Sequence, residues 1–115
     1  MSLDMNPEIR AQWCAALRSG DYAQADGYLH RATGACCLGV LCDLAVKAKV
    51  IGEPVDCGGF WSFEGNAHFL PAAVMTWAGI RENDPVVYGA GALSNLNDDG
   101  TPFAEIADLI DGGAS

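Results

Sequence analysis

The sequence of 115 residues predicts one compact α+β domain, with about four helices around a buried central helix and one or two short β-hairpins. Apolar residues make up 50% of the chain and charged residues 18%, which is a globular composition. The segment 37–50 is apolar on most sides, so we expect its helix to lie at the centre of the fold. Aromatic stretches interrupted by turn residues predict the hairpins. We expect residues 1–115 to form this single domain.

The first predicted helix covers residues 7–20. Asn6 suits its N-cap, Pro7 its first turn and Gly20 its end. In the next segment, 28–36, Tyr28-Leu29-His30 and Ala35-Cys36 flank an Arg-Ala-Thr-Gly stretch, and this pattern predicts a short hairpin.

The central helix over 37–50 has one polar edge, where Asp43 and Lys47 stand at i,i+4 in the favourable order. Residues 51–59 contain Pro54 and three glycines, so this segment is predicted as a loop. The aromatic segment 60–69 then predicts a second hairpin, turning at residues 64–66.

Four shorter elements follow. A helix is predicted over 70–79, a strand over 85–88, and one or two helical turns over 92–96. Thr101 is the expected N-cap of a final helix with Pro102 at its first position, and the apolar residues after it recur at helical spacing.

The acidic residues concentrate at the end of the chain. Residues 1–81 hold eight acids and six bases, whereas residues 82–115 hold seven acids and neither Lys nor Arg, so this third accounts for −7 of the net charge of −9. Direct nucleic-acid binding needs a basic footprint and is therefore not expected. We expect a basic protein partner instead, with self-association left open. The candidate binding residues are Asp98, Asp99, Glu105, Asp108 and Asp111.

Five cysteines, an odd number, indicate reduced thiols and a cytoplasmic protein (Cys14, Cys36, Cys37, Cys42, Cys57). A secretory signal is not apparent, and the longest apolar stretch is interrupted by charges, so no membrane partner is expected.

Cys37 is the centre of an alternative, enzymatic interpretation. A cysteine at the start of a helix is stabilised as thiolate by the helix dipole. The chain order Gln24, Cys37, His68, Asn97 is similar to that of the papain-like cysteine hydrolases. That resemblance implies an oxyanion donor, a nucleophile, a base and an orienting residue, respectively. Leu38 departs from the family, which has an aromatic residue after the cysteine.

No cofactor or metal is favoured. A zinc site would draw on Cys36, Cys37, Cys42 and Cys57, with His30 and His68, but no C-x2-C pair exists. Segment 95–100 partly mimics a calcium loop, yet Ile106 stands where the twelfth-position Glu belongs, so an Asx-rich turn is expected. Trp61, Phe63 and Phe69 are candidates for a ligand pocket, although core packing is the commoner use.

Three segments together resemble a family of small uncharacterised proteins of bacteriophages and bacteria. They are residues 16–24, the CCLGVLCDLA stretch at 36–45, and the C-terminal stretch of LND at 96–98 followed by FAEIADLI at 103–110. The resemblance implies a phage context and no particular reaction. In that context, a small acidic protein is expected to inhibit or modulate a host protein by occupying its basic, nucleic-acid-binding surface, including that of a defence complex.

Overall fold

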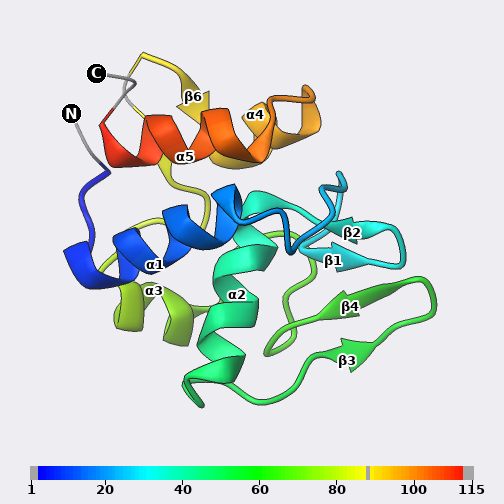
Figure 1. The fold of residues 1–115 in the computed structure, drawn as a ribbon. Helices are drawn as coiled ribbons and strands as arrows, with labels where there is room; N and C mark the ends of the chain where they lie inside the picture. The colour runs from blue at the N-terminus through cyan, green and yellow to red at the C-terminus, as the bar shows by residue number, and fades with distance from the viewer. Residues whose placement is uncertain (1–2, 88, 113–115) are drawn as a thin grey trace.

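Helix α2 (Cys37–Lys47) lies at the centre of the computed structural model, which describes residues 3–87 and 89–112. Figure 1 shows α1 and α3 on one side of α2, a small sheet on the other, and α4 and α5 across one end. Within the described residues there are five helices and two antiparallel sheets, so the predicted α+β class is confirmed. The other helices are α1 (Pro7–Arg18), α3 (Ala72–Ala78), α4 (Leu93–Asp98) and α5 (Phe103–Asp111).

Helix α1 begins where the sequence predicts. The Asn6 side chain accepts hydrogen bonds from the backbone N–H groups of Glu8 and Ile9, at 2.9 and 3.2 Å. The helix packs mainly on α5 and buries Trp13, whose indole Nε1 donates to the Cys37 carbonyl at 2.9 Å. This bond joins α1 to the first residue of the central helix.

Helix α2 is the buried core helix that its composition predicts, with Leu38, Val40, Leu41, Cys42 and Ala45 fully buried. It ends at Lys47, three residues before the predicted end, because Lys49 takes a left-handed conformation with φ 62°.

Gly39 is the point where another segment crosses α2. A Cβ at this position would lie 1.7 Å from the Leu29 carbonyl oxygen, so only glycine allows this close approach. The Leu29 carbonyl also accepts a hydrogen bond from the Cys36 N–H at 3.2 Å, which holds the start of α2 against the chain that precedes the sheet.

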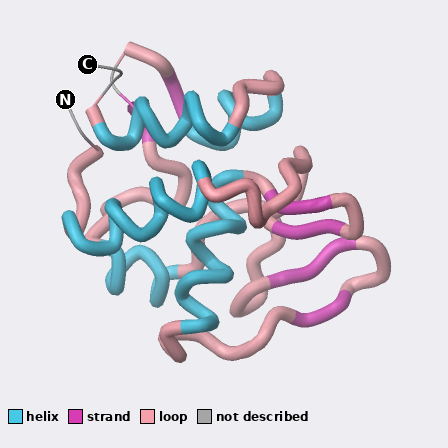
Figure 2. Tube along the Cα trace, in the orientation of Figure 1, coloured by secondary structure: helices cyan, strands magenta, loops and turns pink. Residues whose placement is uncertain are grey.

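Two hairpins join into one four-stranded sheet, in the order β2-β1-β4-β3. The first hairpin, predicted over 28–36, consists of β1 (His30–Arg31) and β2 (Gly34–Ala35). The second consists of β3 (Val55–Asp56) and β4 (Phe60–Ser62), and Figure 2 shows these four strands together beside the helices.

The prediction for 51–69 was therefore partly wrong. The segment predicted as a loop contains β3, and the hairpin turns at Gly58 and Gly59, whose φ values of 87° and 115° suit a glycine turn. The predicted turn at 64–66 exists only as a tight loop closed by an isolated bridge between Phe63 and Asn66.

The C-terminal part adds a small hairpin, β5 (Val86–Val87) with β6 (Gly91–Ala92). The strand predicted over 85–88 corresponds to β5, and Tyr88 lies outside the described residues. Helix α5 begins one residue later than predicted, with Pro102 at the N-cap and no side-chain bond from Thr101. None of the helices described is long and apolar enough to cross a membrane.

Candidate functional site

Three of the four residues of the papain-like pattern lie together, around the side chain of Asn97. This amide is 3% exposed and makes three hydrogen bonds. Its Oδ1 accepts from Gln24 Nε2 at 3.0 Å and from the Cys37 backbone N–H at 3.1 Å, while its Nδ2 donates to the Ala25 carbonyl at 2.7 Å. Asn97 thus caps the start of α2 from a different helix, because a buried N–H group needs a partner.

Gln24 extends this network to the start of α5. Its backbone pairs with Ala35 in a parallel bridge beside β2, which fixes the position of its side chain. Its Nε2 donates to the Thr101 carbonyl at 2.7 Å, and its Oε1 accepts from the Phe103 N–H at 3.2 Å. Gln24 therefore caps the start of α5, the role that the sequence predicts for Thr101.

Cys37 lacks the properties of a nucleophile. Its side chain is fully buried, its Sγ donates to the Leu93 carbonyl at 3.6 Å, and burial raises its pKa well above the usual value. The neutral thiol is therefore strongly favoured over the thiolate at this position, although the cysteine stands at a helix start.

His68 contributes to a different part of the molecule. Its Nδ1 lies 2.7 Å from the Gly27 carbonyl, and its exposed ring stacks on Tyr28 with centroids 4.9 Å apart. The two capping amides thus form one network with the backbone of Cys37, and this network does not use the His68 ring.

The cysteines do not form a metal centre. In residues 3–87 and 89–112 there is no group of three or more His, Cys, Asp or Glu side chains that could hold a metal ion. Cys36 and Cys42 are buried while Cys57 is exposed at the β3–β4 turn, so the four candidate zinc ligands do not come together. Burial raises the pKa of Cys14 to about 12 and that of Cys36 to about 11.

The five candidate binding acids differ in their partners. Arg18 on α1 bridges two of them, with Nη2 at 2.8 Å from Asp108 Oδ1 and Nη1 at 2.9 Å from Asp111 Oδ2. Asp98 Oδ1 accepts from the Gly27 N–H at 3.1 Å. Asp99 and Glu105 are exposed and form no ion pair with any described residue. The segment that resembles a calcium loop is largely helical, because α4 extends to Asp98.

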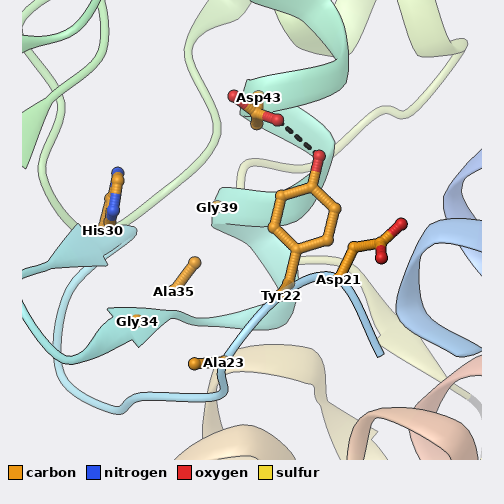
Figure 3. A pocket seen from close by; sticks show the side chains of 8 residues that line it. All are labelled: Asp21, Tyr22, Ala23, His30, Gly34, Ala35, Gly39 and Asp43. Carbon is orange, nitrogen blue, oxygen red and sulfur yellow. Dashed lines mark hydrogen bonds between the residues drawn. The ribbon is translucent and has the colours of Figure 1, made fainter. Parts of the chain in front are cut away.

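Two pockets lie among the described residues. The smaller, of about 190 Å³, lies between the segment 21–23, the first hairpin and α2, and Figure 3 shows the side chains around it. There the Tyr22 hydroxyl donates to Asp43 and lies 3.2 Å from Lys47 Nζ, which also forms an ion pair with Asp43 at 3.1 Å. The Tyr22 hydroxyl, the Asp43 carboxylate and the Lys47 ammonium group therefore already have one another as hydrogen-bonding partners.

The larger pocket, of about 300 Å³, lies between the aromatic side chains near β1 and the exposed side of α4. The sequence singled out two of its aromatic or imidazole side chains, Phe69 and His68, but not Tyr28. Of the other aromatic candidates, Phe63 belongs to the core and Trp61 stacks on His30 at 4.7 Å. Eight residues line this pocket: Gly27, Tyr28, Cys36, His68, Phe69, Ser94, Asn95 and Asp98.

The start of α4 at this pocket is also capped from a distance. The Asp84 carboxylate accepts from the Ser94 N–H at 3.0 Å and from the Ser94 hydroxyl at 2.5 Å. The Asp84 carboxylate therefore stabilises the start of α4, whereas Asp99 and Glu105 form no ion pair with a described residue.

Among comparisons with known proteins, the family model described as "Domain of unknown function (DUF8296)" matches residues 5–113. A search of curated proteins found no match to the chain, and neither did a search of solved structures.

Proposed function

The chain belongs to the DUF8296 family, and we propose that it is a non-enzymatic, phage-type accessory protein that binds a host protein. The proposed binding surface is the acidic face of α4, α5 and the turn between them, formed by Asp98, Asp99, Glu105, Asp108 and Asp111. Its partner is a basic, nucleic-acid-binding surface, such as that of a defence complex, which the carboxylates occupy in place of phosphates.

The unpaired carboxylates of Asp99 and Glu105 are the observation that supports this proposal most directly. Both are exposed, Asp99 at the C-cap of α4 and Glu105 in the first turn of α5, and no ion pair with a described residue neutralises them. By contrast, Asp108 and Asp111 share Arg18, so these three residues together contribute only about one negative charge. The stretch from the end of α4 to the first turn of α5 is thus the part of the acidic face with the least compensated charge.

The burial of Cys37 supports a binding role over a catalytic one. A cysteine hydrolase needs an accessible thiolate, and burial strongly favours the neutral thiol here. All five cysteines are free thiols, which suits the reducing cytoplasm of a bacterial host as the place of action.

A charge-reversed pair of variants tests this proposal. The protein is immobilised, incubated with host lysate at low and at high salt, and the captured proteins are identified by mass spectrometry. We expect a basic nucleic-acid-binding protein that is released at high salt, because screening weakens exposed charge pairs. Asp99→Lys is expected to reduce its affinity by roughly tenfold.

Glu53→Lys is the matched control, because it makes the same charge change at an exposed position outside α4 and α5. Equal weakening by both substitutions would show that only the overall charge matters. Capture that resists high salt, or that Asp99→Lys leaves intact, contradicts the proposed acidic face.

A further inference from the structure

The 300 Å³ pocket combines aromatic faces with a carboxylate. Tyr28 stacks on Phe60 with centroids 4.4 Å apart and on His68 at 4.9 Å, so its ring faces are occupied, whereas Phe69 beside His68 has 42% of its surface exposed. Side chains of α4 line the pocket as well, including the Asp98 carboxylate. Aromatic faces and a carboxylate in one cavity are the groups that bind an organic cation.

The polar groups of the pocket have acceptor capacity left. Asp98 uses Oδ1 for the Gly27 N–H at 3.1 Å, and a carboxylate has further lone pairs to offer. His68 Nδ1 must carry a proton to bond the Gly27 carbonyl at 2.7 Å, so the Nε2 of the neutral ring is an acceptor. The residues that line the pocket, all of them described, include no Lys or Arg. The guanidinium of Arg31 lies 5.6 Å from the Tyr28 ring centroid and is paired with Asp26 at 3.3 Å, so a cationic ligand would meet acceptors and one cation whose charge is already balanced.

The dimensions of the pocket indicate a small group. A volume of about 300 Å³ is at the lower end of the ligand-pocket range of roughly 300–1,000 Å³, which suits a single side chain. A guanidinium group fits this combination better than an ammonium group, because its plane stacks on aromatic rings while its edge bonds a carboxylate. Asp98 also adjoins Asp99 in the proposed acidic face, so the pocket and that face can contact the same partner.

We infer that this pocket binds an arginine side chain of the basic partner, with the guanidinium stacked against the exposed ring of Phe69 and paired with Asp98. This inference rests on the proposed function and specifies its anchoring contact. The acidic face would attract the partner, while the pocket would position one of its arginines.

An NMR titration of the full chain tests the inference without the natural partner. The probe is N-acetyl-arginine amide, and the comparison ligands are the citrulline analogue, which is similar in shape but uncharged, and the lysine analogue. We expect the arginine probe to shift the backbone resonances of Gly27, Tyr28 and Asp98, with citrulline inactive and lysine several-fold weaker. No shift with the arginine probe, or equal binding of citrulline, overturns the cation pocket. Equal binding of lysine overturns the assignment to arginine.

Two neighbouring acids provide a matched pair of variants. Asp98→Asn retains an oxygen for the Gly27 N–H but loses the charge inside the pocket, and we expect roughly tenfold weaker binding of the arginine probe. Asp99→Asn makes the same charge change outside the pocket and is expected to bind like the wild type. Equal effects of the two variants overturn the pocket, while salt-sensitive capture of a basic partner would still support the proposed function.

Phe69→Leu provides a second test. Because Phe69 is exposed, this substitution is not expected to prevent folding. Loss of the ring face is expected to weaken the arginine probe by about threefold. Unchanged binding by Phe69→Leu contradicts the aromatic part of the site.

Discussion

Gln24 Nε2 donates a hydrogen bond of 3.0 Å to Asn97 Oδ1, across 73 residues of sequence. The same Asn97 oxygen accepts from the start of α2, and the Gln24 side chain bonds the start of α5. Two amides therefore connect two helix starts and the C-terminal end of α4. Papain-like enzymes would use such residues around a reacting thiol, whereas here, apart from the bond between the two amides, their bonds go to backbone groups.

Asn97→Ala is expected to destabilise the protein by about 2–4 kcal/mol. The substitution leaves the Cys37 N–H and the Ala25 carbonyl without their partner, and an unsatisfied buried polar group costs roughly 1–3 kcal/mol. Urea denaturation measures the free energy of unfolding. The control is Asn95→Ala on the exposed side of the same helix, which should change stability by less than about 0.5 kcal/mol. Similar stabilities of the two variants would argue against the capping role.

Gly39→Ala is expected to destabilise the fold severely, by about 3 kcal/mol or more, because its Cβ would overlap the Leu29 carbonyl. Gly52→Ala is the control, since a Cβ there meets nothing within 4 Å and the position has no left-handed φ. It should be neutral or slightly stabilising. Thermal unfolding of both variants measures the difference, and a Gly39→Ala protein as stable as wild type would contradict the close approach.

Only Cys57 should react quickly with iodoacetamide in the folded protein near neutral pH. Cys57 is exposed, whereas the other four thiols are buried. Mass spectrometry of the native protein should show one modification, and none in Cys57→Ser. All five thiols should react in denaturant. Fast native labelling of Cys37 would instead favour the cysteine-hydrolase alternative.

Folding stability is expected to fall as the pH rises above about 9. Burial raises the pKa of Cys14 from 9.0 to about 12 and that of Cys36 to about 11, so the folded protein retains protons that the unfolded chain loses. The stability that these groups contribute is fully present below the unfolded value and is lost as the pH rises toward the folded one. Tyr22, whose pKa is also raised, changes stability in the same direction.

Urea midpoints measured across this alkaline range provide the test. Cys14→Ala should show a shallower decline than wild type, because one raised pKa is removed. A flat profile above pH 9 would contradict the burial of the thiols.

Arg18→Gln should have little effect on stability but increase the affinity for a basic partner. The ion pairs of Arg18 with Asp108 and Asp111 are 40% exposed on the arginine side, and such pairs contribute roughly 0–1 kcal/mol. Without them, two carboxylates of the acidic face are free, and affinity should rise by about threefold at low salt. Arg81→Gln is the control, with the same charge change at another exposed site. Equal gains in the two variants would indicate an effect of net charge alone.

Local patterns predicted much of the secondary structure. Asn6 and Pro7 determine the start of α1 through bonds within one helical turn, and the apolar sequence of α2 requires a buried position. The end of α3 at Gly79, with φ 71°, likewise follows from one residue. These features depend on neighbours in the chain, so a sequence alone can predict them.

Contacts between distant residues decided the rest. The sequence suggested Thr101 as the cap of α5, but Gln24 takes this role because the parallel bridge beside β2 brings it there. Cys37 stands at a helix start, where the sequence alone suggested reactivity, yet tertiary packing buries its thiol and raises its pKa. The sequence determined the acidic charge of the last third; only the tertiary structure decided that Arg18 pairs with two of its carboxylates and that Asp98 adjoins an aromatic pocket. Charge is a property of composition, whereas pairing and burial depend on which distant residues the fold brings into contact.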